Sequence, residues 1–134
     1  MNLQAYAITP NTKPRMTRAD KWKQRPCVMQ YRAYKDALRE LSIELPESGY
    51  HLIFVLPMPK SWSKKKRAEM RGQPHKATPD KDNLEKGLLD ALFVDDAHIW
   101  DGRVSKYWGD EGQIIVKRIP TYDTLDEALN STIH

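Results

Sequence analysis

Two aspartates stand close together in the segment from residue 79 to 86, which reads Pro-Asp-Lys-Asp-Asn-Leu-Glu-Lys. Pro79 fixes its own φ angle and biases the residue before it towards an extended conformation. In an extended segment, Asp80 and Asp82 project to the same side because they are two residues apart. One interpretation is that either aspartate simply caps the helix that follows. A cap needs only one carboxylate, however, and the second adds repulsion.

A second acidic pair, Asp95-Asp96, follows the same predicted helix. Adjacent residues of an extended segment point to opposite faces, so only one of this pair can join Asp80 and Asp82. Crowded carboxylates repel each other, and their pKa values rise unless a cation neutralises them. Mg²⁺ prefers oxygen ligands, and in phosphodiester hydrolysis it polarises the phosphoryl group and activates water. The acidic residues therefore predict a magnesium site for hydrolysis of a phosphodiester.

Lys86 lies one helical turn after Asp82 and on the same face. One interpretation is an ion pair between residues four apart, worth a few tenths of a kcal/mol, about 0.2–0.5. The other is a cation directed at the scissile phosphate, where it offsets charge that develops in the transition state. Spacing alone leaves both interpretations open.

The formal net charge is +4, and the positive excess is concentrated in two stretches. Residues 60–76 carry seven basic side chains against Glu69, and residues 13–25 carry six against Asp20. Trp62 and Trp22 lie within these stretches. Basic residues interleaved with aromatic ones suit a polyanion held along its phosphates, although a solvated surface is the alternative for each stretch. The basic residues of the second stretch are Lys13, Arg15, Arg18, Lys21, Lys23 and Arg25.

Apolar side chains recur at helical spacing over residues 28–41 and 82–92, which predicts two amphipathic helices. Ser63 is a candidate N-cap for a short helix over residues 64–70. The segment 124–129 forms a further short helix or frays. The side chains expected to face the core are Tyr31, Tyr34, Leu38 and Leu41 in the first main helix and Leu84, Leu88, Ala91 and Leu92 in the other.

Alternating or densely apolar residues predict strands over residues 3–9, 50–57, 104–108 and 113–117. Gly109-Asp-Glu-Gly112 separates the last two segments, which is typical of a closing hairpin. Hairpin strands are antiparallel, so we expect a mixed sheet with the helices on one face. The fold class is therefore α+β (mixed α/β), a single domain with about four strands and two main helices.

The length of 134 residues suits one domain, and 40% hydrophobic with 30% charged residues argues against wholesale disorder. No apolar run approaches the roughly 20 residues needed to span a bilayer, and the N-terminus lacks the pattern of a secretion signal. A single cysteine, Cys27, excludes an internal disulfide framework and a four-cysteine zinc site. We therefore expect a cytoplasmic protein with no membrane partner.

The acidic segments together resemble the RusA family of Holliday junction resolvases. The family pattern is Asp-x-Asp-Asn-Leu, then a lysine, then Asp-Ala-Leu, then a paired Asp-Asp, and all of these stand here in that order. A lone Asp-x-Asp is weak evidence, whereas the whole spaced set is specific. The clear match spans residues 76–107, and a looser one reaches the N-terminal strand and the loop at Pro14-Arg15. One departure is Gly87, which costs the helix about 1 kcal/mol relative to alanine and suggests a close approach to its backbone.

The resemblance implies a homodimeric, Mg²⁺-dependent endodeoxyribonuclease that nicks four-way DNA junctions in symmetric pairs, in recombination and repair. Mn²⁺ is the expected substitute ion. By the same resemblance, Asp80 and Asp82 match the first two catalytic, metal-binding aspartates, and Asp96 matches the third. Lys86 matches the essential lysine, and Asp95 is then the neighbour that faces away.

The resemblance also places DNA along the basic segment before Asp80 and along the loop around residues 13–18. A two-fold dimer has two identical sites, which matches the symmetry of opposed junction strands. We expect a RusA-like endonuclease domain over residues 1–120 and a C-terminal extension over residues 121–134. The expected DNA contacts are Lys13, Arg15, Arg18, Lys64, Lys65, Lys66, Arg67, Lys76 and Lys81.

Two other functions are compatible with the sequence. The first is a non-catalytic, basic nucleic-acid-binding protein whose aspartates serve as helix caps. The second is a metal-dependent phosphohydrolase that acts on nucleotides. The first would not nick DNA, and the second would show little of the salt dependence expected of an enzyme that grips DNA.

Overall fold

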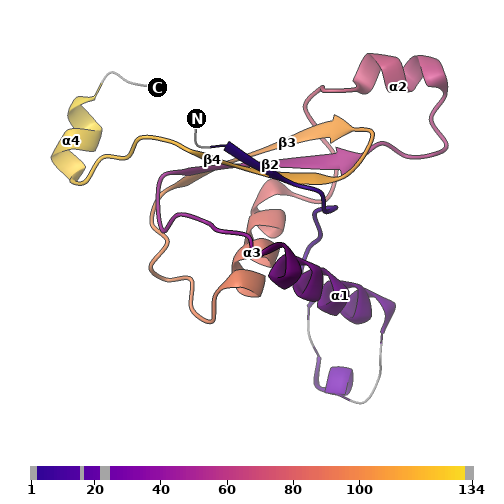
Figure 1. The fold of residues 1–134 in the computed structure, drawn as a ribbon, viewed down its shortest axis with the longest axis horizontal. Helices are drawn as coiled ribbons and strands as arrows, with labels where there is room; N and C mark the ends of the chain where they lie inside the picture. Colours follow the sequence, from indigo (N-terminus) through magenta and orange to yellow (C-terminus); the bar gives the residue numbers. More distant parts are fainter. Residues whose placement is uncertain (1–2, 16, 22–24, 132–134) are drawn as a thin grey trace.

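The computed structural model describes residues 3–15, 17–21 and 25–131. Within them the chain forms, in order, β1 (Leu3–Tyr6), the 3-10 helix η1 (Arg18–Lys21), α1 (Pro26–Leu41), β2 (Tyr50–Pro57), α2 (Lys64–Met70), α3 (Lys81–Leu92), β3 (Gly102–Gly109), β4 (Gln113–Arg118) and α4 (Leu125–Asn130). Figure 1 shows α1 and α3 on one side of the sheet and the short helices α2 and α4 beyond its opposite ends. The predicted α+β class is confirmed. None of the helices in this described part has the length and apolar character needed to cross a membrane.

The four strands form one mixed sheet in the order β1-β4-β2-β3. β2 pairs in parallel with β3 and antiparallel with β4, which in turn pairs antiparallel with β1. The predicted hairpin between β3 and β4 is therefore wrong, since β2 lies between them. Gly109 explains how so short a connection can cross the end of β2, because a Cβ there would lie 2.4 Å from Cγ1 of Val55.

The central position of β2 follows from its composition. Its residues alternate between buried and half-buried positions, and neither face of the strand is strongly polar. Leu52 and Phe54 are fully buried on the face that meets the helices. A strand with apolar residues on both of its faces is stabilised when a neighbouring strand pairs along each of its edges, so β2 lies in the middle of the sheet.

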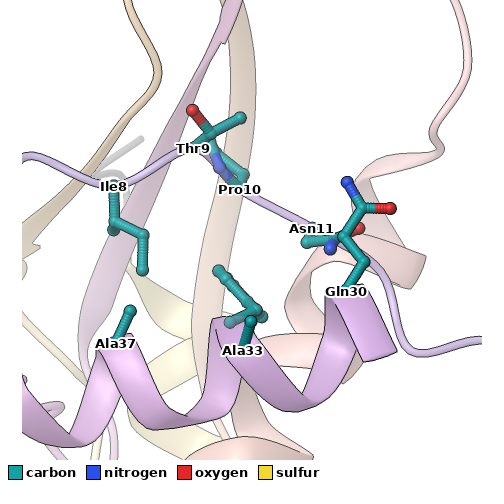
Figure 2. Close-up of a pocket in the computed structure, with 8 residues that line it drawn as sticks. Ile8, Thr9, Pro10, Asn11, Gln30, Ala33 and Ala37 are labelled. Atoms are coloured by element: carbon teal, nitrogen blue, oxygen red, sulfur yellow. The ribbon is translucent and has the colours of Figure 1, made fainter. Parts of the chain in front are cut away.

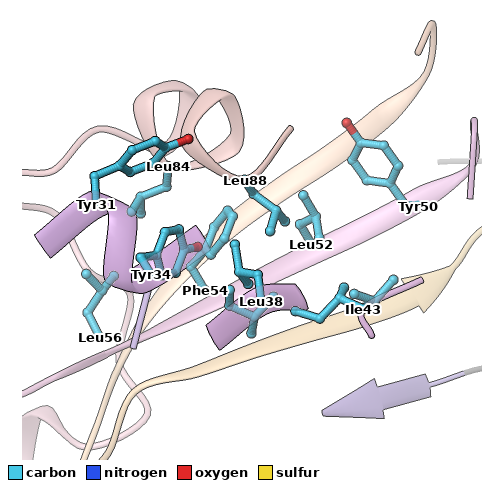
Figure 3. Packing of buried hydrophobic residues seen from close by; sticks show 12 residues of the cluster. Tyr31, Tyr34, Leu38, Ile43, Tyr50, Leu52, Phe54, Leu56, Leu84 and Leu88 are labelled. Atoms are coloured by element: carbon cyan, nitrogen blue, oxygen red, sulfur yellow. The ribbon is translucent and has the colours of Figure 1, made fainter. Parts of the chain in front are cut away.

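The core lies between the sheet and the two main helices (Figure 3). The expected stripe of α1 is buried at Tyr31, Tyr34 and Leu38 but ends there, since Leu41 is 38% exposed. From α3, Leu84 and Leu88 are fully buried. Each such side chain contributes roughly 1.5–3 kcal/mol by its removal from water. The buried stripe therefore fixes the rotation of each helix about its axis.

Each short helix begins at a residue whose side chain caps it, and of these two residues Ser63 was predicted as a cap. The Ser63 hydroxyl accepts a hydrogen bond from the Lys66 amide at 3.1 Å, at the start of α2. Thr124 caps α4 in the same way through the Glu127 amide, at 3.2 Å. Both predicted short helices are confirmed. None of the described residues of α4 belongs to the buried core.

The segment after β1 runs across α1 and then over α3. Figure 2 shows residues 8–11 passing along α1, beside a cavity of about 300 Å³. Beyond it, the backbone of residues 11–13 lies directly against Gly87 in the middle of α3. A Cβ at this position would lie 2.9 Å from the carbonyl oxygen of Asn11. The close approach suggested by this glycine is therefore present.

Gly87→Ala is expected to lower the free energy of unfolding by about 1 kcal/mol. The gain of about 1 kcal/mol in helix propensity is outweighed by the shift of the backbone of residues 11–13, since overpacking costs roughly 1–3 kcal/mol. Urea denaturation followed by circular dichroism measures the change. Asn83→Ala, an exposed position of the same helix, serves as the control and should stay within about 0.5 kcal/mol of the parent. A Gly87→Ala protein more stable than the parent would contradict this account.

Candidate active site

The acidic segment enters α3 differently from the sequence prediction. Asp80 is the N-cap residue and is extended, with φ −68° and ψ 149°. Its carbonyl already accepts the first helical hydrogen bond, from the Leu84 amide at 3.1 Å. Asp82 lies inside the first turn of the helix. The prediction that both aspartates share an extended segment is therefore wrong, because the helix begins two residues earlier than that arrangement requires.

The Asp80 carboxylate does not act as a helix cap. The residue occupies the N-cap position, yet its side chain accepts no capping hydrogen bond from the described residues. Asp80 and Asp82 are both exposed. They lie at the helix N-terminus, where the backbone amides favour negative charge. Two exposed carboxylates are thus held at the start of α3, and neither is explained by a capping hydrogen bond from the described residues.

Lys86 pairs with carboxylates other than the one predicted from spacing. Its Nζ lies 3.1 Å from Asp90 Oδ1, one turn further along α3, and 3.2 Å from Asp96 Oδ2. Hydrogen bonds to Asp90 and then to Asp96 raise the pKa of Lys86 above its usual value. Lys86 is therefore a fixed positive charge at neutral pH, held between two carboxylates.

The two adjacent aspartates after α3 have different surroundings. Asp95 is exposed and accepts a hydrogen bond from the Ala97 amide at 2.9 Å, which makes a local turn. Asp96 faces Lys86, and its side chain is 27% exposed. Of this pair, Asp96 is the residue that contacts Lys86 of α3.

The structure brings Asp96 to Lys86 but does not gather the three predicted aspartates around one point. In the part of the chain that the structure describes, no group of three or more His, Cys, Asp or Glu side chains could hold a metal ion. The donor chemistry itself suits a hard cation, since all three predicted ligands are carboxylates. A shared metal site at Asp80, Asp82 and Asp96 therefore stays a prediction.

Asp96 also borders a hollow that the sequence did not indicate. This cavity has a volume of about 360 Å³ and contains two further acidic side chains, Glu85 and Asp101. The Tyr50 hydroxyl donates to Glu85 Oε2 at 2.6 Å. Burial is the main cause that raises the pKa of Tyr50, and this hydrogen bond is the next. Glu85 is thus held by Tyr50 and is directed away from the exposed face of α3.

Lys106 is a residue near the site that the sequence analysis did not identify. Its Nζ donates to the carbonyl oxygens of Ala77 and Pro79, both at 2.7 Å. The Pro79 carbonyl belongs to the peptide unit that leads into Asp80, so Lys106 holds the backbone from which that carboxylate projects. Lys106 is the pairing partner of the buried residue Phe54, a register that the sequence did not indicate. A lysine on the core-facing side of a strand needs a polar partner.

The long basic connection between β2 and α3 is fastened to the edge of the sheet. Trp108 of β3 contacts Trp62 and His75, with ring centroids 4.8 and 4.1 Å apart. The Trp108 amide donates to the Gln73 carbonyl at 3.0 Å, and Pro74 bridges to β3. The segment therefore covers the open edge of β3, which an exposed edge strand requires. Of the predicted DNA contacts in and after it, Lys64, Lys65, Lys66, Lys76 and Lys81 are exposed and Arg67 is half-buried.

The N-terminal basic residues lie on the side of α3 that the segment 11–13 crosses. Lys13 Nζ is 3.6 Å from Asp90 Oδ2. Arg15 and Arg18 are exposed, and the Arg15 carbonyl accepts a hydrogen bond from Arg25 Nη2 at 2.8 Å. Trp22 and Lys23, which contribute to the basic stretch, lie outside the described residues.

A comparison with protein families matches residues 5–118 to the model described as Endodeoxyribonuclease RusA. The chain belongs to the RusA family. The match covers most of the 134 residues and includes every predicted catalytic residue. The protein is accordingly an endodeoxyribonuclease, which excludes the non-catalytic alternative. A search of curated proteins gave no match.

Lys106→Met is expected to reduce the rate of DNA nicking by at least about 10-fold while DNA affinity changes by less than about twofold. It removes two charge-assisted hydrogen bonds, each worth roughly 1.5–3 kcal/mol, from the backbone before Asp80. Arg103→Met, which alters an exposed cation of the same strand, is the control and should nick normally. Single-turnover nicking and equilibrium binding measure the two effects. Full nicking activity in Lys106→Met would show that the hold on this backbone is irrelevant to the reaction.

Proposed function

We propose that this RusA-family endonuclease resolves four-way DNA junctions by paired, symmetric nicks that depend on a divalent cation, Mg²⁺ or Mn²⁺. The observation that carries the proposal is the position of Lys86. Its ammonium group lies beside Asp96 and one turn from Asp82, on the exposed face of α3. A cation and carboxylates on one exposed face suit the hydrolysis of a phosphodiester.

In this proposal Asp80, Asp82 and Asp96 hold the cation. When bound, the cation would neutralise the carboxylates, polarise the phosphoryl group and activate the attacking water. Support comes from Asp80, whose carboxylate lacks a capping hydrogen bond within the described chain although it stands at the N-cap. Further support comes from Asp96, the member of the Asp95-Asp96 pair that faces α3.

The proposed role of Lys86 is to bind the scissile phosphate and offset the charge of its transition state. An ammonium group between two carboxylates stays protonated at neutral pH, so Lys86 acts as a cation and not as a base. Because the Lys86 side chain is 60% exposed, its ammonium group can reach a bound phosphate without any movement of α3. Lys86 is in this respect a catalytic residue, while Asp90 and Asp96 determine its charge state.

The proposed DNA path runs over the two basic surfaces that flank this face. Lys64 and Lys65 project from α2, and the contact between Trp62 and Trp108 fixes the chain at the start of that helix. Lys66 Nζ lies 4.4 Å from the centre of the Trp62 ring, so part of the basic surface is held in place by a cation–π interaction. On the other side, Lys13, Arg15 and Arg18 would follow the phosphates.

Paired nicks require two active sites, so the proposal includes a homodimer. We further assign catalysis to residues 1–120 and treat residues 121–134 as an extension. This division is supported by the buried core, whose described members all precede residue 117. It is also supported by the family match, which stops at residue 118.

Asp82→Asn is expected to reduce Mg²⁺-dependent nicking of a labelled four-way junction by at least about 100-fold, because a neutral amide is a poor ligand for a hard cation. Junction binding without metal should change by less than about threefold. Asp36→Asn, which alters an exposed aspartate of α1, is the matched control and should nick at the parental rate. Nicking at full rate in Asp82→Asn would rule out the proposed metal site.

Replacement of Lys64, Lys65 and Lys66 by alanine is expected to weaken junction binding at every sequence tested. The dependence of log K on log salt should become shallower by roughly 0.9 for each phosphate that these lysines no longer neutralise. A matched triple variant, with Arg32, Lys35 and Arg39 of α1 changed to alanine, removes the same charge from another helix. Fluorescence anisotropy over a salt series measures both proteins. Equal decreases in affinity for the two variants would assign the effect to net charge instead of to a DNA path over α2.

A further inference from the structure

Asp90 lies between two lysines that come from distant parts of the chain. Its Oδ1 is 3.1 Å from Lys86 Nζ on the preceding turn of α3. Its Oδ2 is 3.6 Å from Lys13 Nζ in the N-terminal segment. The Asp90 side chain is only 20% exposed, compared with 42% for Lys13 and 60% for Lys86. One partly shielded carboxylate thus holds two more exposed ammonium groups, one on each oxygen.

The position of Lys13 follows from the crossing at Gly87. The backbone amide of Lys13 would lie 3.1 Å from a Cβ on Gly87, and the carbonyl of Asn11 is closer still. From the other side, the Tyr31 hydroxyl donates to the Gly87 carbonyl at 2.8 Å. The N-terminal segment is therefore seated on α3 three residues before Asp90. Lys13 reaches Asp90 from a fixed backbone position.

Helix stability does not explain an aspartate at position 90. A lysine four residues before an acid is the less favourable order for an ion pair within a helix. Asp90 also lies in the last turn of α3, which ends at Leu92, and the negative end of the helix dipole disfavours a carboxylate there. Exposed ion pairs contribute little to folding. The residue is better explained by what it holds than by the helix that carries it.

We propose that Asp90 is a positioning residue that holds Lys13 and Lys86 on one side of α3, so that both ammonium groups contact the DNA backbone at the cleavage site. The proposal rests on the proposed function for the role of Lys86. It links the N-terminal basic segment to the catalytic lysine through one shared carboxylate. Lys13 then binds a phosphate close to the one that is cut.

The charged and titratable groups that face Lys86 come from each neighbouring element. They are Asp82 and Asp90 on the same face of α3, Asp96 of the following loop, Lys13 through its contact with Asp90, and Tyr31 of α1, on which Lys86 acts electrostatically. Loss of the Asp90 charge removes the contact from each of the two lysines, and this change can be measured on the protein alone.

Asp90→Asn separates positioning from net charge, because the two effects have opposite signs. Loss of a carboxylate makes the protein more positive, and charge alone would strengthen DNA binding and leave nicking unchanged or faster. Positioning predicts slower nicking, by about 10-fold or more at saturating junction, in spite of the added charge. Asp36→Asn carries the same charge change on the exposed surface of α1 and is the matched control.

The experiment combines three measurements on the full chain. NMR spectra at one pH should show shifted side-chain resonances of Lys86 in Asp90→Asn, because its contact with position 90 is altered, and unchanged ones in Asp36→Asn. Single-turnover nicking should slow only in Asp90→Asn, and Asp90→Glu should recover part of the rate because it keeps the charge. The unfolding temperature should stay within a few degrees of the parent for all variants. A slower reaction is then not caused by unfolding of the protein.

Three results would overturn the proposal, and they can be told apart. Parental nicking by Asp90→Asn together with a strong defect in Lys86→Ala would show that Lys86 acts without Asp90, and the proposed function would stand. Parental nicking by Lys86→Ala would instead remove the role of Lys86 on which both proposals depend. Unchanged Lys86 side-chain resonances in Asp90→Asn would likewise show that the pair does not exist in solution.

Discussion

The rotation of α3 about its own axis is the constraint on which the candidate active site depends. Leu84 and Leu88 are fully buried, and turning the helix would expose them at a cost of roughly 1.5–3 kcal/mol for each side chain. Residues four apart share one face of a helix, so the same burial also sets the direction of Asp82, Lys86 and Asp90. The apolar stripe thereby orients the charged one. The site needs no rigid loop to present its lysine, because a packed helix does so.

The charged face of α3 is poorly explained by the stability of the helix. Asp80 stands at the N-cap without making the capping hydrogen bond within the described chain, and Asp90 stands near the end where a carboxylate is unfavourable. Gly87, in the middle, is the residue with the lowest helix propensity after proline. Natural proteins depart from such local rules mainly at functional sites. Two departures on a twelve-residue helix and a third at its N-cap fit its place in an endonuclease.

Local patterns were enough to predict most elements, while the errors came from long-range contacts. The helices and strands follow from periodicity, and the residues of the family motif could be chosen by their spacing. The hairpin after β3 was wrong because the length of a connection does not reveal that β2 has taken the place between the two strands. The contacts of Lys106 and Asp90 were not predicted because their partners, Pro79 and Lys13, are far away in sequence. Convergence of the three aspartates depends equally on tertiary structure, which no spacing rule supplies.

Both basic surfaces are joined to α3, one at each end. The segment after α2 is paired along β3 and reaches Asp80 through the backbone that Lys106 holds. The segment after β1 crosses at Gly87 and ends with Lys13 at Asp90. Binding energy from remote phosphates helps a reaction only if the contacts are rigidly connected to the reacting centre. In this fold the connections are backbone pairing and close helix contact, so along the proposed DNA path a phosphate bound at either surface would be held in a defined position relative to Lys86.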